Sequence, residues 1–157
     1  MPKISTMLWF DGKAEEAANF YVSVFKNSRV TGISRYPEGS PGTAGTVMTA
    51  AFELDGRPFT ALNAGPLFKF NESISFVVHC QTQTEVDEYW EKLSEGGAES
   101  DCGWVKDKFG LSWQITPDVL IELLGDKDPE KAKRVMQAML QMKKIDIQRL
   151  KQAYEQQ

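Results

Sequence analysis

The stretch Gly103-Trp-Val-Lys-Asp-Lys-Phe-Gly-Leu-Ser-Trp-Gln-Ile-Thr116 decides the fold, because a turn sequence lies in it between two segments of alternating polarity. Asp107 and Gly110 suit the first and last positions of a tight turn. The residues on either side alternate as they do in β-strands, so the stretch predicts a β-hairpin. In its outgoing strand Trp113 would face the core, and Gln114 would face the opposite side of the sheet.

The beginning of the chain contains a counterpart of this half of the sequence. Ile4-Ser5 recurs as Ile74-Ser75, and in both places an apolar strand pattern and then a helical pattern follow. The second helix opens with a capping box from Thr82 to Glu85, in which each side chain satisfies an amide at the helix end. The sequence therefore predicts two copies of one module.

The two copies also close in the same way. In the second copy the glycine of the turn, Gly110, precedes Trp113-Gln114. Gly56 precedes Phe59-Thr60 at the same spacing. Each copy is thus predicted to consist of a strand, a helix and three further strands. The strands expected in the first copy are Ile4 to Phe10, Val30 to Tyr36, Thr46 to Leu54 and Arg57 to Asn63, and Asp11 is expected to cap the helix.

Composition and charge exclude several classes of function. The chain has 157 residues, of which 41% are hydrophobic and 25% charged, as in an ordinary globular domain. A net charge of -4 provides no basic surface for a phosphate backbone, so we expect no nucleic-acid partner. No apolar run approaches the roughly 20 residues that cross a bilayer, and no signal sequence follows Met1, so we expect no membrane partner.

The two cysteines, Cys80 and Cys102, are too few for a disulfide framework and lack the spacing of metal ligands. We interpret them as reduced, structural thiols. Because reduced thiols are typical of the cytoplasm, we predict a cytoplasmic protein.

Two motifs carry a resemblance to a known family. They are Asp107-Lys-Phe-Gly-Leu-Ser-Trp113 and Phe68-Lys-Phe-Asn-Glu-Ser-Ile-Ser-Phe76. Together with the paired modules, they resemble the PhnB-like branch of the glyoxalase, or vicinal oxygen chelate, superfamily. Members of this branch are often labelled 3-demethylubiquinone-9 3-methyltransferases.

The resemblance implies an α+β fold in which paired βαβββ modules form a curved, mixed β-sheet cup, and it implies a homodimer. The glyoxalase-like domain would span residues 1–116, with modules at about 1–66 and 70–116. Helical signals fill residues 117–157, where Asp128-Pro129 and Asp146 are expected to begin two helices. This C-terminal extension would pack on the domain or on the dimer partner.

Enzymes of the superfamily hold a divalent metal at four positions, one on the first and one on the last strand of each module. Matched residue by residue, those positions fall in this sequence on Ser5, Thr60, Ser75 and Gln114. Neutral hydroxyls and amides lack the charge and basicity of imidazole or carboxylate ligands. We therefore predict no bound metal, and we predict no other cofactor.

A cup lined by aromatic and neutral polar residues would suit a small, flat or partly apolar molecule. His79, the only histidine, is the candidate for a general base; the alternative is a polar residue of the wall that is hydrogen-bonded to a loop. No other catalytic residue is assigned. The predicted ligand-binding residues are Ser5, Trp9, Asn63, Phe68, Ser75, His79 and Gln114.

Three functions remain open at this stage. The chain could be a metal-independent protein that binds a small molecule, or an enzyme that acts on a quinone-like or other oxygenated substrate. The third is the methyltransferase reaction of the family label, although no glycine-rich loop follows a strand as it would in a nucleoside-binding site.

Overall fold

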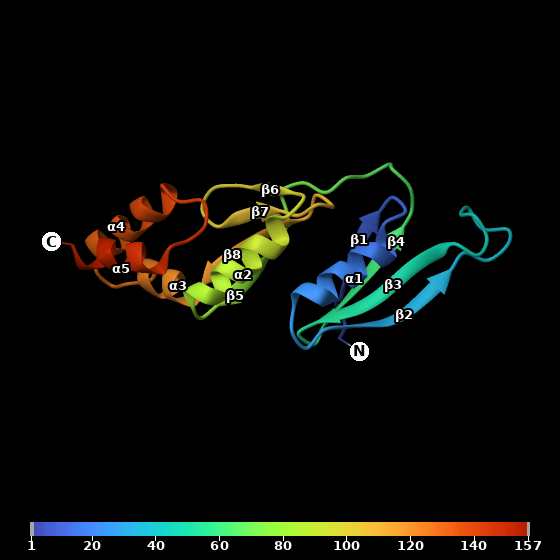
Figure 1. Ribbon diagram of the computed structural model, residues 1–157, viewed down its shortest axis with the longest axis horizontal. Helices are drawn as coiled ribbons and strands as arrows, with labels where there is room; N and C mark the ends of the chain where they lie inside the picture. The colour runs from blue at the N-terminus through green and yellow to red at the C-terminus, as the bar shows by residue number, and fades with distance from the viewer. Residues whose placement is uncertain (1, 157) are drawn as a thin grey trace. The chain divides into compact units, whose positions relative to one another are not determined.

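Two units with the same strand order form the chain in the computed structural model, which describes residues 2–156. The units are Met1–Phe70 and Asn71–Gln157. Each contains a four-stranded mixed sheet with one helix against it (Figure 1).

In the first unit a strand and a helix precede three further strands. The elements are β1 (Thr6–Phe10), α1 (Ala14–Val24), β2 (Arg29–Arg35), β3 (Val47–Leu54) and β4 (Arg57–Asn63). The sheet order is β1-β4-β3-β2, with β1 parallel to β4 and the other pairs antiparallel. The face that α1 covers is the core of the unit. Leu8, Phe10 and Phe52 are buried there, and they alternate along their strands with more exposed residues.

The second unit repeats this arrangement and continues into three helices. The elements are β5 (Ser75–Cys80), α2 (Gln83–Ser94), β6 (Ala98–Glu99), β7 (Trp104–Lys106), β8 (Ser112–Pro117), α3 (Asp118–Leu124), α4 (Pro129–Leu140) and α5 (Ile147–Glu155). The sheet order is β5-β8-β7-β6, again with the first pair parallel. The fold is therefore the predicted α+β arrangement of paired βαβββ modules with helices at the C-terminus.

The pairing register confirms the internal repeat residue by residue. Met7 lies opposite Thr60 in the first sheet, and their sequence counterparts, Val77 and Gln114, lie opposite each other in the second. An alternating strand can keep its apolar residues on the core side only in one register. The repeated hydrophobic pattern is thus the physical reason for the repeated register.

The predicted hairpin of the opening stretch is present. Strand β7 runs antiparallel to β8, and the amide of Gly110 donates a 2.9 Å hydrogen bond to the carbonyl oxygen of Asp107. Trp113 is buried in the core, as its place in the strand predicted, and Gln114 is on the opposite face.

The expected cap of the first helix was wrong. Asp11 lies before Gly12, whose φ of 75° turns the chain, and the helix begins only after Lys13, whose side chain makes no capping bond. The side chain of Asn63, at the end of β4, accepts the hydrogen bond from the amide of Ala14 at 2.9 Å. The other predicted N-caps are confirmed at Thr82, Asp128 and Asp146.

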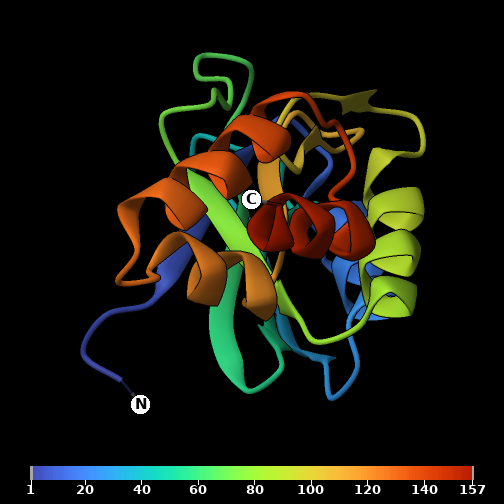
Figure 2. The same cartoon turned by 90° about the vertical axis from the view of Figure 1, so that its left-hand side faces the viewer.

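The C-terminal helices pack within the second unit. Their own core contains Leu120, Val135, Met142, Ile145 and Leu150. Figure 2 shows α3, α4 and α5 gathered together on this unit.

The segment before α5 joins these helices to the rest of the second unit. The amides of Cys102 and Gly103 donate to the carbonyl oxygens of Met142 and Lys143 at 2.9 and 2.7 Å. Gly103 has a φ of 84°, and a Cβ there would lie 3.0 Å from the carbonyl oxygen of Ile115, so the close approach requires glycine.

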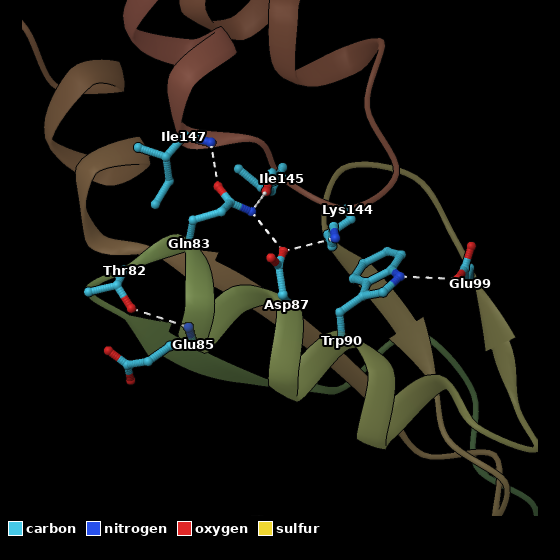
Figure 3. A network of polar contacts seen from close by, with 9 residues as sticks. All are labelled: Thr82, Gln83, Glu85, Asp87, Trp90, Glu99, Lys144, Ile145 and Ile147. Atoms are coloured by element: carbon cyan, nitrogen blue, oxygen red, sulfur yellow. Dashed lines mark hydrogen bonds and ion pairs between the residues drawn. The ribbon is translucent and has the colours of Figure 1, made fainter.

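A glutamine at the start of α2 makes the second connection (Figure 3). The side-chain nitrogen of Gln83 donates to the carbonyl oxygen of Ile145 at 2.9 Å, and its side-chain oxygen accepts from the amide of Ile147 at 2.8 Å. Beside it, Asp87 forms an ion pair of 2.8 Å with Lys144. Polar contacts therefore attach the start of α5 to the start of α2.

Among the helices of residues 2–156, none is both long enough and apolar enough to span a bilayer.

Candidate functional site

In each unit one helix, α1 or α2, packs on one face of the sheet. The side chains of the parallel strand pair that point to the opposite face, called the open face below, include exposed residues such as Met7 and His79. Residues that lie opposite each other in adjacent strands point to the same side, so the register identifies which side chains share the open face. Around the first parallel pair these are Met7 and Trp9 on β1 and Thr60 and Leu62 on β4. All four are uncharged, so this part of the first face is neutral.

Two predicted ligand-binding residues meet on the first unit. The indole nitrogen of Trp9 donates a 2.8 Å hydrogen bond to the carbonyl oxygen of Gly65, which fixes the ring. Phe68 approaches it edge-on, with 4.9 Å between ring centroids, and remains exposed. The pair forms an aromatic surface that is accessible to a ligand.

The remaining two predicted residues of the first unit lie differently. Ser5 is exposed and precedes β1. Asn63 uses both ends of its amide inside the unit, because its oxygen accepts from Ala14 and its nitrogen donates to the carbonyl oxygen of Val47 at 3.1 Å. Its observed contacts hold α1 and β3 to the end of β4.

On the second unit the open face is more polar. It carries Ser75, Val77 and His79 on β5 and Gln114 and Thr116 on β8, and Val77 is the only apolar residue among these five. The side-chain nitrogen of Gln114 donates to the hydroxyl oxygen of Ser75 at 3.0 Å. Two of the predicted residues thus form one hydrogen-bonded pair.

His79 has an acidic neighbour that sequence reasoning missed. The Oδ1 atom of Asp118, the first residue of α3, lies 3.4 Å from Nδ1 of His79. Both side chains remain about half exposed, so a ligand can reach the imidazole. An acidic residue directly after the last predicted strand was the available signal, but nothing in the sequence relates its position to that of His79.

A second charged pair was also missed. Lys106 on β7 lies opposite Ser112, on the same face as Gln114, and its ammonium group forms an ion pair with Glu72. The hydrogen bond from Lys106 lowers the pKa of Glu72, and a backbone hydrogen bond acts in the same direction. The open face of the first unit also carries a charged pair, because Arg29 on β2 lies opposite Glu53 on β3, with 3.4 Å between their charged groups.

The four positions matched to the superfamily's metal ligands do not fit a divalent cation. Thr60 and Gln114 are at equivalent places in their sheets, but an alcohol and an amide are weak ligands, and the amide of Gln114 is already paired with Ser75. Within residues 2–156 there is no group of three or more histidine, cysteine, aspartate or glutamate side chains that could hold a metal ion. No step of a reaction can be derived through a metal at these residues.

Two buried groups near the site are structural. The carboxylate of Asp107, 2% exposed, accepts hydrogen bonds from the amides of Phe109 and Leu111 and from the indole of Trp113, at 2.8, 3.1 and 2.8 Å. These bonds shape the hairpin turn. Burial raises the pKa of the Cys80 thiol to about 12, so this cysteine is an unreactive part of the core.

Comparison with known proteins defines the class of the chain. The sequence model of the family described as 3-demethylubiquinone-9 3-methyltransferase matches residues 2–116. The structure of the PhnB protein from Bacillus cereus is 41% identical in sequence and has a TM-score of 0.68. The match covers 74% of this chain and 99% of the Bacillus cereus chain. The chain belongs to this PhnB-like family of glyoxalase-fold proteins.

More distant structures share the fold. A protein of Pseudomonas aeruginosa is 19% identical with a TM-score of 0.61, and the match covers 74% of this chain and 98% of the Pseudomonas chain. The fosfomycin resistance protein FosX from Mesorhizobium loti is 12% identical with a TM-score of 0.52. That match covers 72% of this chain and 90% of the FosX chain. Among curated proteins there is no match. The family match ends at residue 116, inside β8, so α3, α4 and α5 all lie outside it.

Proposed function

We propose that this chain binds a small, partly apolar or aromatic molecule in the β-sheet cup characteristic of its family, without a divalent metal. The observation that carries the proposal is the kind of side chain on the open sheet faces. An accessible aromatic pair, Trp9 and Phe68, is on one unit, and the neutral pair Ser75 and Gln114 is on the other. Ligand sites commonly combine apolar walls with a few fixed polar groups of this type.

A screen of uncharged aromatic compounds tests this proposal. Native mass spectrometry identifies compounds that bind, and calorimetry measures their affinity. Replacing Gln114 with alanine should weaken binding by about tenfold, because one hydrogen bond to the ligand is lost. The matched control is Gln137→Ala, on the exposed side of α4. Failure of every aromatic class to bind, or equal loss in both variants, would contradict the proposal.

Metal independence is tested separately. Protein purified without added ions should contain well under one equivalent of any divalent metal, and chelator should leave ligand affinity unchanged. One tightly held ion per chain would overturn this part of the proposal, whatever the ligand.

The alternative function is an enzyme that acts on a quinone-like or oxygenated small molecule. The observation in its favour is the carboxylate of Asp118 beside the imidazole of His79, an arrangement that can support proton transfer. Turnover of such a compound that is lost in His79→Gln would favour the enzyme. Calorimetric binding of S-adenosylmethionine would favour the methyltransferase activity for which the family is named.

We also propose a homodimer in the cytoplasm. An exposed isoleucine occurs at the same place in both modules: Ile4 is 87% exposed and Ile74 is 69% exposed. The strand that follows each isoleucine, β1 or β5, is an edge strand of its own sheet. A second copy would remove this apolar surface from water. Sedimentation velocity should give a dimer, and Ile4→Glu with Ile74→Glu should give a monomer.

A further inference from the structure

We propose that Asp118 is a positioning residue that turns His79 into a hydrogen-bond and proton acceptor for a ligand hydroxyl. The inference rests on the proposed function, because the hydroxyl belongs to the small molecule on the open face. It adds to that function a residue from outside the matched domain and a ligand class, namely phenols and enols.

The geometry assigns different tasks to the two nitrogens of His79. Nδ1 faces the Oδ1 atom of Asp118 at 3.4 Å. An ionised carboxylate can only accept hydrogen bonds, so it favours the imidazole form that carries its proton on Nδ1. In that form Nε2 has a free lone pair. The side chain is 58% exposed, so the remaining part of the ring is accessible from the open face.

The C-terminal helices hold Asp118 in this place. The residue follows Pro117, the buried last residue of β8, and begins α3. Two residues later, Leu120 is buried in the core that α3, α4 and α5 share. The backbone of Asp118 is therefore fixed on one side by the sheet and on the other by the extension. Asp118 lies outside the part of the chain that the family model matches, residues 2–116.

The proposed interaction is a hydrogen bond that can become a proton transfer, and it needs no further reactant. A phenol or enol O–H donates its hydrogen bond to Nε2 of His79. If the proton moves, the O–H bond breaks, an Nε2–H bond forms, and the ligand keeps the electron pair as phenolate or enolate. The resulting imidazolium lies beside the carboxylate of Asp118, which stabilises its positive charge.

The histidine tautomer gives a direct test without any ligand. Because His79 is the only histidine, two-bond ¹H–¹⁵N spectra of histidine-labelled protein contain one imidazole. The spectra are recorded at about pH 8, and free imidazole prefers its proton on Nε2. We expect the Nδ1–H form to predominate in the wild type and to be replaced by the Nε2–H form in Asp118→Ala.

Glu122→Ala is the matched control, because Glu122 is an exposed carboxylate on the same helix. It should leave the tautomer unchanged, and the amide spectra of both variants should show an intact fold. A predominant Nε2–H form in the wild type, or the same tautomer in Asp118→Ala, would overturn the assignment of Asp118.

Phenol and its methyl ether, anisole, test the acceptor role. Phenol should shift the Nε2 resonance of wild-type His79, and anisole, which has no hydroxyl hydrogen, should not. In Asp118→Ala the affinity for phenol should fall by about tenfold, as for the loss of one oriented hydrogen bond. Equal shifts by both probes, or no shift by phenol, would overturn the acceptor role.

The outcomes separate this inference from the proposed function. Compounds that bind the chain while His79 keeps its spectrum would support the proposed function and contradict the inference. The expected tautomer together with a failure of every aromatic compound to bind would retain the positioning by Asp118 and contradict the proposed function.

Discussion

The two modules of this protein have the same strand order and register, yet they stabilise that arrangement with different side chains. In the first module, Asn63 at the end of β4 caps α1. In the second, the equivalent position is Pro117, and α2 is capped from its own sequence by Thr82. The comparison teaches that the apolar pattern determines the topology, whereas the polar contacts that secure it can change.

The hairpins differ in the same way. The first turns at Asp55-Gly56, both exposed and both with positive φ. The second turns around the buried carboxylate of Asp107. The first turn depends on local backbone conformation, and the second depends on hydrogen bonds inside the core.

The open faces differ in chemistry. Trp9 of the first module corresponds to His79 of the second, and Thr60 corresponds to Gln114. The same backbone positions thus present an aromatic surface in one module and hydrogen-bonding groups in the other.

The largest effect that separates the modules should come from the turns. Asp107→Ala removes the acceptor of three hydrogen bonds and leaves buried donors unsatisfied, so we expect it to cost about 3 kcal/mol of unfolding free energy in urea denaturation. Asp55→Asn, in the exposed turn, should change stability by less than about 0.5 kcal/mol. Similar losses in both variants would show that the two turns work alike.

The next effect concerns the glycines of positive φ. Gly103→Ala combines an unfavourable backbone conformation with close contacts to Ile115 and Ile145, and should cost about 2 kcal/mol or more. Gly56→Ala has the same kind of φ but open space around it, and should cost about 1 kcal/mol. Thermal unfolding of both variants measures the difference. Equal costs would mean that the C-terminal segment does not press on Gly103.

The helix caps should give a smaller difference. Asn63→Ala removes bonds to both Ala14 and Val47 and should cost between about 1 and 2 kcal/mol. Thr82→Ala should cost about 1 kcal/mol, because Glu85 still accepts from the amide of Gln81. Chemical denaturation of the two variants gives the order, and a larger loss in Thr82→Ala would reverse this part of the comparison.

The smallest effect should be a pH dependence that comes from Glu72 in the second module. The pKa of Glu72 is lowered by Lys106, so the folded state favours the ionised carboxylate. This stabilisation is complete above the ordinary pKa of about 4.5 and is lost as the pH falls through the lowered value. Glu72→Gln should therefore lose less stability than the wild type on acidification. The unfolding free energy of both proteins is measured from about pH 5 to about pH 3, a range around that pKa. Parallel curves for the wild type and Glu72→Gln would contradict this prediction.

Much of the fold follows from the sequence because its signals are local or periodic. The repeat of Ile4-Ser5 at Ile74-Ser75 predicted two like modules, and alternation placed Trp113 in the core. Capping residues next to their helices, such as Thr82 and Asp146, were also predictable. The cap of α1 was not, because Asn63 is far from Ala14 along the chain.

The candidate site was predictable only in part. Ser75 and Gln114 were expected on one face and are hydrogen-bonded to each other, whereas nothing in the sequence related the position of Asp118 to that of His79. Whether these residues bind a ligand stays a prediction.

The sequence by itself thus determined the two modules, the succession of one strand, one helix and three strands in each, and the side of the sheet that each strand residue faces, because period and spacing encode all three. The order of the strands within each sheet came only from the tertiary structure. The tertiary structure decided which distant polar groups meet: Lys106 with Glu72, Gln83 with the start of α5, and Asp118 with His79. Such pairs depend on where loops and helices lie relative to the sheet of their unit, and those positions are determined by the packing of the whole unit.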